Sequence, residues 1–223
     1  MTALARSLQP VVPSLPERAR AALGALWILA RDHDRLDQVL VMTRAVNAGS
    51  VARAVTRIAA TEEGRRLFAE RPRIDRAHVD FDALRRLPDG TLGREYTRFL
   101  DDNGITPDAF QELPAVEDER AAAIILRMRQ THDLWHVLTG YTPDVRGELL
   151  LQAFTYAQVR IPSALVLVVF GTLRWMKLDR AYFAALREAY RRGAAASYLP
   201  TFRWEEHWGT PVSELRAMLR CPA

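Results

Sequence analysis

Apolar residues recur at helical spacing along almost the whole of this chain of 223 residues. No alternating apolar and polar run is long enough to predict a strand. Glycine, proline and capping residues separate the helical patterns: Gly49, Gly140 and Gly193 are predicted helix ends, and Ser50 and Thr61 are predicted helix starts. We therefore predict an all-α fold, built as a single compact multi-helix domain. The predicted helices cover residues 18–31, 34–47, 51–60, 61–71, 92–102, 116–139, 161–173, 179–192 and 210–220, with a further helix starting near residue 147.

The composition allows a substantial core and excludes some classes of protein. Apolar residues make up 49% of the chain, and the formal net charge is +4. Lys177 is the only lysine, and the arginines are scattered among acids, which argues against a nucleic-acid partner. A contact with an anionic membrane surface stays open. The single cysteine, Cys221, excludes an internal disulfide and fits a reducing compartment.

The start of the chain differs from the rest. Residues 1–30 are rich in arginine and alanine and contain one acid, Glu17, and no secretory signal is evident. This composition is typical both of an organellar transit peptide and of a bacterial amphipathic helix. We predict an N-terminal extension over residues 1–16 and the all-α domain over residues 17–223.

Four side chains that can bind a metal ion lie close together in the sequence: His132, Asp133, His136 and Glu148. His132 and His136 are four residues apart, so on a helix they project from one face and can bind the same ion. Asp133 borders that face. Neutral imidazoles and carboxylates suit zinc, iron or manganese. The pattern predicts a metal site, with a buried hydrogen-bonded network as the alternative.

The connection after the histidines brings Glu148 back toward them. The long helix ends at Gly140, residues 141–146 form a short connection, and the next helix begins near Gly147. So short a link predicts an antiparallel pair of helices. We therefore expect the metal site to lie between these two antiparallel helices.

Two other classes of metal protein carry related motifs. Helix-borne zinc proteases use His-Glu-x-x-His, whereas His132 is followed by Asp133, whose side chain is one methylene shorter. All-α phosphohydrolases with an adjacent His-Asp dyad need further, widely separated ligands. His33, His78 and His207 could supply them, but none has a convincing surrounding motif.

The sequence around the candidate ligands resembles the Coq4 family of ubiquinone biosynthesis. The family signature is His-Asp-x-x-His followed, after eleven residues, by Glu, and the four candidate ligands match it at every position. Residues 134–141 also resemble the family, as do residues 90–93 with Tyr96. The resemblance extends from about Leu23 to the predicted helix that closes the chain.

The resemblance implies an all-α fold, a bound divalent metal and a polyprenylated aromatic substrate. By position, the metal ligands and catalytic residues would be His132, Asp133, His136 and Glu148. Coq4 proteins are associated with replacing the C1 carboxylate of a polyprenylated 4-hydroxybenzoate-type precursor by a hydroxyl. We therefore expect a metal-dependent decarboxylase or hydroxylase. The alternative is a non-catalytic, lipid-binding scaffold that organises other biosynthetic enzymes and holds a structural metal.

The implied reaction bears on the identity of the metal. Replacing a ring carboxylate by a hydroxyl removes two electrons from the ring, so an oxidant such as dioxygen is required. Zinc cannot change its oxidation state, whereas iron or manganese can. The metal could instead only bind the phenolate while the electron-rich ring itself reacts with dioxygen. Zinc, iron and manganese all stay open.

Residues beside the motif are candidates for contacts with a substrate. Tyr141 and Arg146 could hydrogen-bond a substrate carboxylate, and Gln152, one turn after Glu148, could orient that side chain. The uncharged segment 161–173 is too short to cross a bilayer, because a spanning helix needs about 20 apolar residues. We expect it to be a buried core helix or one wall of a cavity for an isoprenoid tail.

The resemblance also implies partners and a location. The expected partners are a polyprenylated aromatic acid or isoprenoid lipid, other ubiquinone-biosynthesis enzymes, a membrane surface and a second copy in a homodimer, without nucleic acid. The expected location is peripheral, on the cytoplasmic face of a bacterial inner membrane. In a eukaryote it would be the matrix side of the mitochondrial inner membrane.

Overall fold

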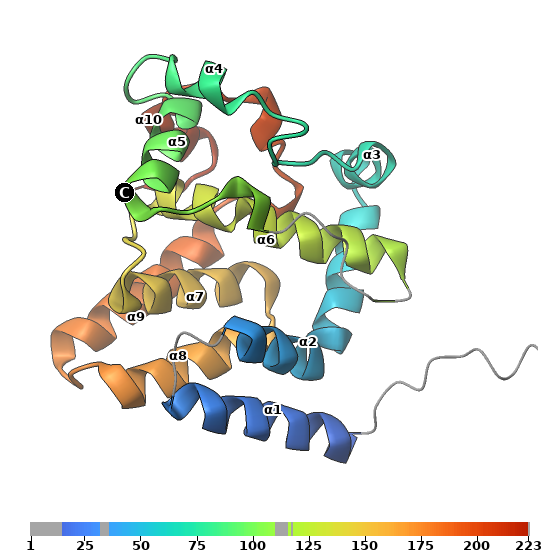
Figure 1. The fold of residues 1–223 in the computed structure, drawn as a ribbon, viewed down its shortest axis with the longest axis vertical. Helices are drawn as coiled ribbons and strands as arrows, with labels where there is room; N and C mark the ends of the chain where they lie inside the picture. Colours follow the sequence, from blue (N-terminus) through green and yellow to red (C-terminus); the bar gives the residue numbers. More distant parts are fainter. Residues whose placement is uncertain (1–14, 32–35, 110–115, 117, 223) are drawn as a thin grey trace, which may run out of the picture. The chain divides into compact units, whose positions relative to one another are not determined.

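Helices make up the architecture throughout the described part of the chain (Figure 1). The computed structural model describes residues 15–31, 36–109, 116 and 118–222. Within these residues there is no strand, and the β-bridge between Thr91 and Pro211 is isolated. The all-α prediction is confirmed. The helices are α1 (Leu15–Arg31), α2 (Leu36–Ala59), α3 (Glu62–Glu70), α4 (Phe81–Arg85), α5 (Leu92–Asn103), α6 (Glu119–Thr139), α7 (Val145–Val159), α8 (Pro162–Trp175), α9 (Arg180–Ala195) and α10 (Val212–Met218), with short 3-10 helices η2 (Pro107–Ala109), η3 (Leu199–Thr201) and η4 (Trp204–Glu206).

The chain divides into two units, residues 1–48 and residues 49–223. In the first unit α1 exposes Leu23 and Trp27, and the Arg31 guanidinium lies 3.3 Å from the centre of the Trp27 ring. The second unit contains all the predicted metal ligands. The division into residues 1–16 and 17–223 stays a prediction, and residues 1–14 lie outside the described part.

Local capping chemistry sets most helix boundaries in the second unit. Thr61, Asp118, Asp144 and Asp179 each accept hydrogen bonds from backbone N–H groups in the first turn of the helix that follows. Gly140 ends α6 in the left-handed conformation, at φ 78°, which glycine adopts without strain. The predicted end at Gly140 is confirmed.

Two predicted helix ends at glycine are wrong. Gly49 and Ser50 do not separate two helices, because α2 runs through both, and Ser50 accepts a hydrogen bond from Arg53 instead of capping. Gly193 does not stop α9, which continues to Ala195. A Cβ atom at Gly193 would lie only 2.5 Å from the Phe154 carbonyl oxygen, so this glycine allows α9 to approach α7 closely.

The main core of the second unit lies between α5, α6, α7 and α10. Trp135 and Leu134 from α6 and Phe154 from α7 are completely or almost completely buried there. Helix α7 runs back beside α6 after a short connection and also packs against α8 and α9 (Figure 1). This arrangement confirms the predicted helix pair and places the end of α6 next to the start of α7.

Helix α8 buries its small residues and exposes large apolar ones, the reverse of the usual distribution. Its buried residues are small: Ser163, Ala164, Gly171 and Thr172. Its large apolar residues form a stripe on the surface, where Leu165, Val169 and Leu173 are 45%, 52% and 72% exposed. The prediction of a buried core helix is therefore wrong, and the alternative of a wall for an isoprenoid tail stays a prediction. The small residues are buried because they let α8 pack closely on α7.

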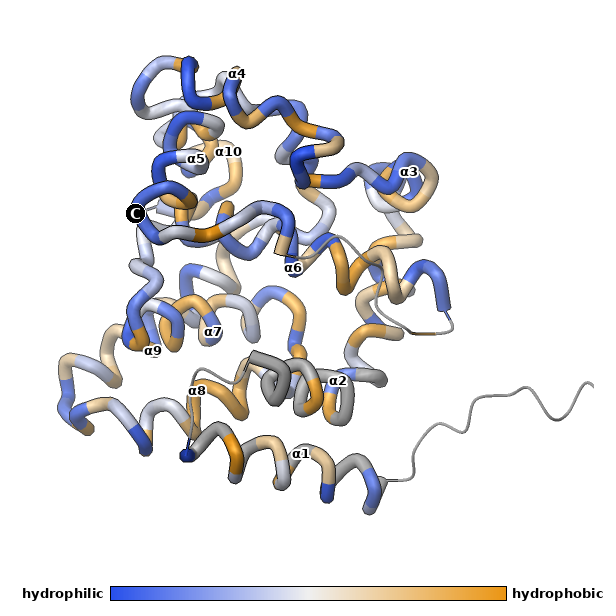
Figure 2. The backbone as a smooth tube through the Cα atoms, viewed as in Figure 1, coloured by the Kyte–Doolittle hydropathy of each residue, from blue (hydrophilic) through white to orange (hydrophobic). Residues whose placement is uncertain are grey.

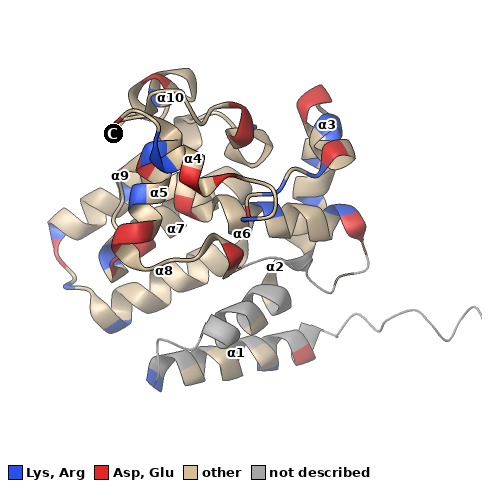
Figure 3. Cartoon of the chain, turned by 45° about the horizontal axis from the view of Figure 1, so that its top comes forward, with Lys and Arg blue, Asp and Glu red and all other residues tan. Residues whose placement is uncertain are grey.

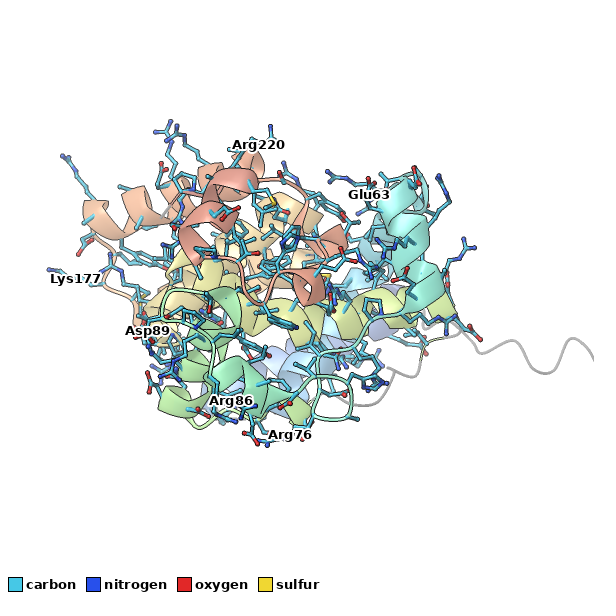
Figure 4. All side chains as sticks on the ribbon, turned by 90° about the horizontal axis from the view of Figure 1, so that it is seen from above. Glu63, Arg76, Arg86, Asp89, Lys177 and Arg220 are labelled. Atoms are coloured by element: carbon cyan, nitrogen blue, oxygen red, sulfur yellow. The ribbon has the colours of Figure 1, made fainter. Side chains whose placement is uncertain are left out.

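The corner between α8 and α9 adds basic side chains to this stripe. Residues 161–178 contain no acid, and Figure 2 colours much of α8 as hydrophobic. Figure 3 shows α8 without acidic residues. Arg174, Lys177 and Arg180 are exposed at the corner together with Leu178, and Figure 4 shows Lys177 at the outer edge. None of the described helices is long and apolar enough to cross a membrane.

Candidate metal centre

Three of the four predicted ligands converge in the structure. His132 and His136 on α6 and Glu148 on α7 each offer one donor atom, and these atoms lie within 4.8 Å of one another. His136 Nε2 is 3.0 Å from Glu148 Oε1, and His132 Nε2 is 3.7 Å from Glu148 Oε2. The carboxylate thus faces both imidazoles from the neighbouring helix.

The local sequence explains this convergence. The spacing of four residues places both histidines on one face of α6, and Gly140 ends the helix directly after them. Asp144 then caps α7, so that Glu148 lies in the first turn of α7. Gly147 allows the connection to fold tightly, because a Cβ atom there would be 2.0 Å from the Thr142 carbonyl oxygen.

The hydrogen bonds of His136 place either a second ring proton or a metal ion between its Nε2 and Glu148. His136 is buried, and its Nδ1 lies 2.9 Å from the Tyr141 carbonyl oxygen. A carbonyl oxygen can only accept, so Nδ1 carries a proton, and if the ring is neutral Nε2 presents a lone pair. That lone pair faces a carboxylate oxygen at 3.0 Å. Two acceptors at this distance require a second ring proton or a metal ion between them.

The donor set fits a divalent metal ion. Bonds from zinc to histidine nitrogen and carboxylate oxygen are about 2.0–2.2 Å long. The separations of 3.0 Å and 3.7 Å from the two carboxylate oxygens to the imidazoles are less than twice that length, so one ion can contact a nitrogen and an oxygen together. A neutral imidazole anchored through Nδ1 to a carbonyl is also the usual state of a metal-bound histidine.

Charge in the site is balanced between His132 and Glu148. Burial lowers the pKa of His132, but its hydrogen bond with Asp133 and the charge of Glu148 outweigh burial, and the pKa is raised overall. Burial raises the pKa of Glu148, but the hydrogen bond with His136 and the charge of His132 outweigh it, and the pKa is lowered overall. A metal ion that binds here therefore competes with the proton on His132.

Asp133 lies beside the cluster rather than within it. Its Oδ1 is 3.4 Å from Nδ1 of His132, on the other side of the ring from Nε2. This position suits a carboxylate that orients His132 for metal binding. Direct ligation by Asp133 stays a prediction.

The three substrate candidates lie in different surroundings. Tyr141 is half-buried, and its hydroxyl accepts a hydrogen bond from Arg192 at 3.0 Å. Arg146 is exposed at the start of α7, next to Asp144. Gln152 is half-buried, one turn after Glu148 on α7. Their roles toward a substrate stay predictions.

The other histidines do not join the cluster. Nδ1 of His78 is 2.5 Å from Asp75, and His207 lies near Thr210. His33 lies outside the described residues. The wider ligand set that an all-α phosphohydrolase needs is thus not assembled around His132 by the described histidines.

The sequence did not reveal the residues of other helices that support His136. Phe99 on α5 stacks on the His136 ring, with ring centres 5.2 Å apart. Arg192 on α9 and Arg216 on α10 donate hydrogen bonds to backbone carbonyls at the end of α6. No local motif marks these residues, because their contacts depend on how α5, α9 and α10 pack against α6.

An apolar cavity of about 140 Å³ lies at a different position, between α3 and α6. Its lining includes Leu67, Phe68 and Ile124 and none of the three metal donors. Pockets for drug-sized ligands are typically about 300–1,000 Å³. This cavity is therefore too small for a drug-sized ligand or a long isoprenoid tail.

Comparisons with known proteins agree on one family. The family described as "Coenzyme Q (ubiquinone) biosynthesis protein Coq4" matches residues 11–222. The chain is 35% identical over 199 residues to the mitochondrial ubiquinone biosynthesis protein COQ4 homolog of Xenopus tropicalis, covering 89% of this chain and 70% of that protein. It is 31% identical over 219 residues to the Mus musculus homolog, covering 96% and 82%.

A solved structure has the same fold. The crystal structure of a Nostoc punctiforme PCC 73102 protein assigned to ubiquinone biosynthesis superposes with a TM-score of 0.73 at 28% identity. The match covers 92% of this chain and 99% of that one. With the sequence signature, the helix pair and these matches in agreement, the chain belongs to the Coq4 family of ubiquinone biosynthesis proteins.

Proposed function

We propose that this protein catalyses a metal-dependent oxidative decarboxylation in ubiquinone biosynthesis. The substrate is a polyprenylated 4-hydroxybenzoate-type precursor whose C1 carboxylate is replaced by a hydroxyl. The observation that carries the proposal is the pair of facing acceptors, His136 Nε2 and Glu148 Oε1, 3.0 Å apart. Membership of the Coq4 family supports the pathway.

The residues of the site have separate tasks in this reaction. His132, His136 and Glu148 hold the ion, and Asp133 orients His132 through Nδ1. Phe99 covers one face of the His136 ring and excludes water from it. A bound divalent ion supplies Lewis acidity toward the substrate carboxylate or phenolate and, as iron or manganese, redox capacity.

The chemistry requires an oxidant. The bond between C1 and the carboxylate breaks, the carboxylate carbon leaves as CO₂, and a new bond joins C1 to oxygen. With the new oxygen taken from water, the ring loses two electrons in this exchange, and dioxygen accepts them and is reduced to hydrogen peroxide. The reaction is therefore expected to stop when oxygen is removed.

The second candidate function is a lipid-binding scaffold with a structural metal. Structural zinc sites are usually closed by four protein ligands, and Asp133 beside His132 supplies a fourth candidate. Purified protein incubated with a short-tailed substrate and dioxygen, without other biosynthetic enzymes, separates the two functions. Release of CO₂ with formation of the hydroxylated ring supports the enzyme, whereas metal-loaded protein without turnover supports the scaffold.

Metal content is the first test of the site. We expect anaerobically purified wild type to contain about one equivalent of metal and His136→Ala to lose it. His78→Ala is the matched control, since His78 pairs with Asp75 outside the cluster. Iron or manganese that is lost only in His136→Ala supports the redox reaction. Zinc that is lost in the same way supports the site and leaves Lewis-acid catalysis and the scaffold as the candidates. Absence of metal from wild type refutes the proposal.

We propose that the corner between α8 and α9 binds the lipid partner and holds the protein at the membrane surface. Exposed Leu173 and Leu178 can enter the interfacial region of a membrane, and Arg174, Lys177 and Arg180 can contact anionic head groups. Each basic residue near an anionic surface contributes about 1 kcal/mol. The same apolar stripe offers a surface for an isoprenoid tail. We also propose a homodimer and contacts with other ubiquinone-biosynthesis enzymes.

Vesicle binding tests this location. Full-length protein should sediment with vesicles that contain phosphatidylglycerol, and less with pure phosphatidylcholine. Lys177→Gln should weaken binding about fivefold, which corresponds to about 1 kcal/mol, and Leu173→Glu should weaken it further. Met218→Glu is the control, because Met218 is similarly exposed on α10. Equal binding by Leu173→Glu and wild type contradicts the assignment.

A further inference from the structure

Arginines from two other helices hold the end of α6 next to the metal site. Arg216 on α10 donates from Nε to the Leu138 carbonyl oxygen at 2.7 Å, and from another guanidinium nitrogen to Val137 at 3.3 Å. Arg192 on α9 donates to the Thr139 carbonyl oxygen at 2.9 Å. Both residues satisfy carbonyls that have no partner within the helix. In this respect they are equivalent.

Arg192 also contacts Tyr141, which Arg216 does not. Its other terminal nitrogen donates to the Tyr141 hydroxyl at 3.0 Å, and its guanidinium lies 5.0 Å from the centre of the Tyr141 ring. Arg192 therefore holds residues 139 and 141 together. The segment between them contains Gly140, which takes a left-handed backbone conformation and directs the chain out of α6.

Tyr141 connects this arginine to the metal site. Its carbonyl oxygen accepts the hydrogen bond from His136 Nδ1 at 2.9 Å, and His136 Nε2 faces Glu148. The position of one carbonyl group thus decides which ring nitrogen of His136 carries the proton and where Nε2 points. That carbonyl belongs to Tyr141, whose hydroxyl is held by Arg192 and whose ring packs partly against the core.

We propose that Arg192 is a positioning residue of the metal centre, which acts through Tyr141 to fix the tautomer and orientation of His136. The inference rests on the proposed metal binding by His132, His136 and Glu148. Partners that orient a metal-bound histidine typically contribute 10–100-fold to metal affinity. Arg216 contacts the same helix end without contacting Tyr141, so it contributes to the stability of the fold and not to metal affinity.

Cobalt binding by the full-length protein tests the proposal. Co²⁺ is titrated into metal-free wild type, Arg192→Met and Arg216→Met, and the visible absorption bands report both affinity and coordination geometry. We expect Arg192→Met to bind Co²⁺ at least tenfold more weakly, with shifted bands. Arg216→Met should melt at a lower temperature but bind Co²⁺ within about twofold of wild type, because it removes a helix-end contact alone.

Two further variants keep the test decisive if Arg192→Met does not fold. Arg192→Lys retains one donor and should recover part of the affinity. Tyr141→Phe removes the anchored hydroxyl while it keeps the carbonyl, and should shift the cobalt bands with a smaller loss of affinity. Partial recovery of Co²⁺ affinity in Arg192→Lys, together with shifted cobalt bands in Tyr141→Phe, supports a positioning role for Arg192.

The outcomes separate this inference from the proposed function. Wild type that binds Co²⁺, with Arg192→Met or the milder variants binding it equally well and with unchanged bands, overturns the role of Arg192 alone. Equal losses of affinity in the Arg192 and Arg216 variants overturn it too, because they show a general effect of helix-end stability. Wild type that takes up no metal overturns the proposed metal centre and the positioning role with it.

Discussion

The close approach of α9 to α7 predicts a clear stability difference between two helical glycines. A Cβ atom at Gly193 would lie 2.5 Å from the Phe154 carbonyl oxygen and 3.0 Å from Ala157 Cβ. The first of these is a backbone atom of α7, so a whole helix has to move to make room. At Gly49 in α2 a Cβ atom would meet, among the described residues, only the end of the Arg53 side chain, at 3.7 Å.

The expected magnitudes follow from two opposing effects. Overpacking typically costs about 1–3 kcal/mol, and replacing glycine by alanine within a helix gains up to about 1 kcal/mol. Because backbone atoms of α7 oppose the new methyl group, we place the cost of Gly193→Ala in the upper half of that range. The net destabilisation is then about 1–2 kcal/mol, or about 2–8 °C in Tm for a chain of this size. Gly49→Ala should raise Tm by about 2–4 °C.

Thermal unfolding of wild type, Gly193→Ala and Gly49→Ala under identical conditions measures the difference. Metal-free protein is used, so that ligand binding does not add to stability. A Gly193→Ala protein that melts at or above the wild-type temperature would refute the reasoning, since α9 could then accept a methyl group against α7 without cost. Because Arg192 directly precedes Gly193, metal affinity should fall together with stability in this variant.

Two further predictions concern buried ionisable groups. Burial raises the pKa of Asp75, but hydrogen bonds from His78 and Arg73 outweigh it and lower the pKa below its ordinary value of 3.8. The resulting stabilisation is present above that ordinary pKa and is lost as the pH falls through the lowered value. The gap in urea stability between wild type and Asp75→Asn should therefore shrink in acid, and a gap independent of pH would contradict this. Burial raises the pKa of the Cys221 thiol, with Arg192 opposing it, so iodoacetamide should label Cys221 slowly in the native protein and rapidly in urea. Equal labelling rates would show that the thiol is accessible.

Helix content and most helix ends were predictable because they depend on near neighbours. The cap at Thr61, the glycine end at Gly140 and the short connection before α7 each involve residues within a few positions of one another. The same local rules failed at Gly49 and Gly193. At Gly193 the small residue allows a close helix–helix contact with Phe154, which cannot be predicted from the spacing of residues in the sequence.

Burial along α8 was not predictable either. An uncharged apolar segment is equally compatible with the core and with a surface that contacts lipid or another protein. Packing decided the matter, because the small residues Gly171 and Thr172 face inward while Leu173 is exposed. Which face of a helix is buried depends on the shape of its neighbours as well as on its own hydrophobicity.

In the candidate metal centre, the sequence and the tertiary structure determine different features. The sequence by itself determined the donors, because four-residue spacing on a helix places His132 and His136 on one face and a capped turn returns Glu148 to them. Only the tertiary structure decided which nitrogen of His136 faces Glu148, that Phe99 covers the ring, and that Arg192 holds Tyr141 from 51 residues away. Helical periodicity and capping act between near neighbours in the chain. The support of a ligand depends on helices that meet only when the core is packed.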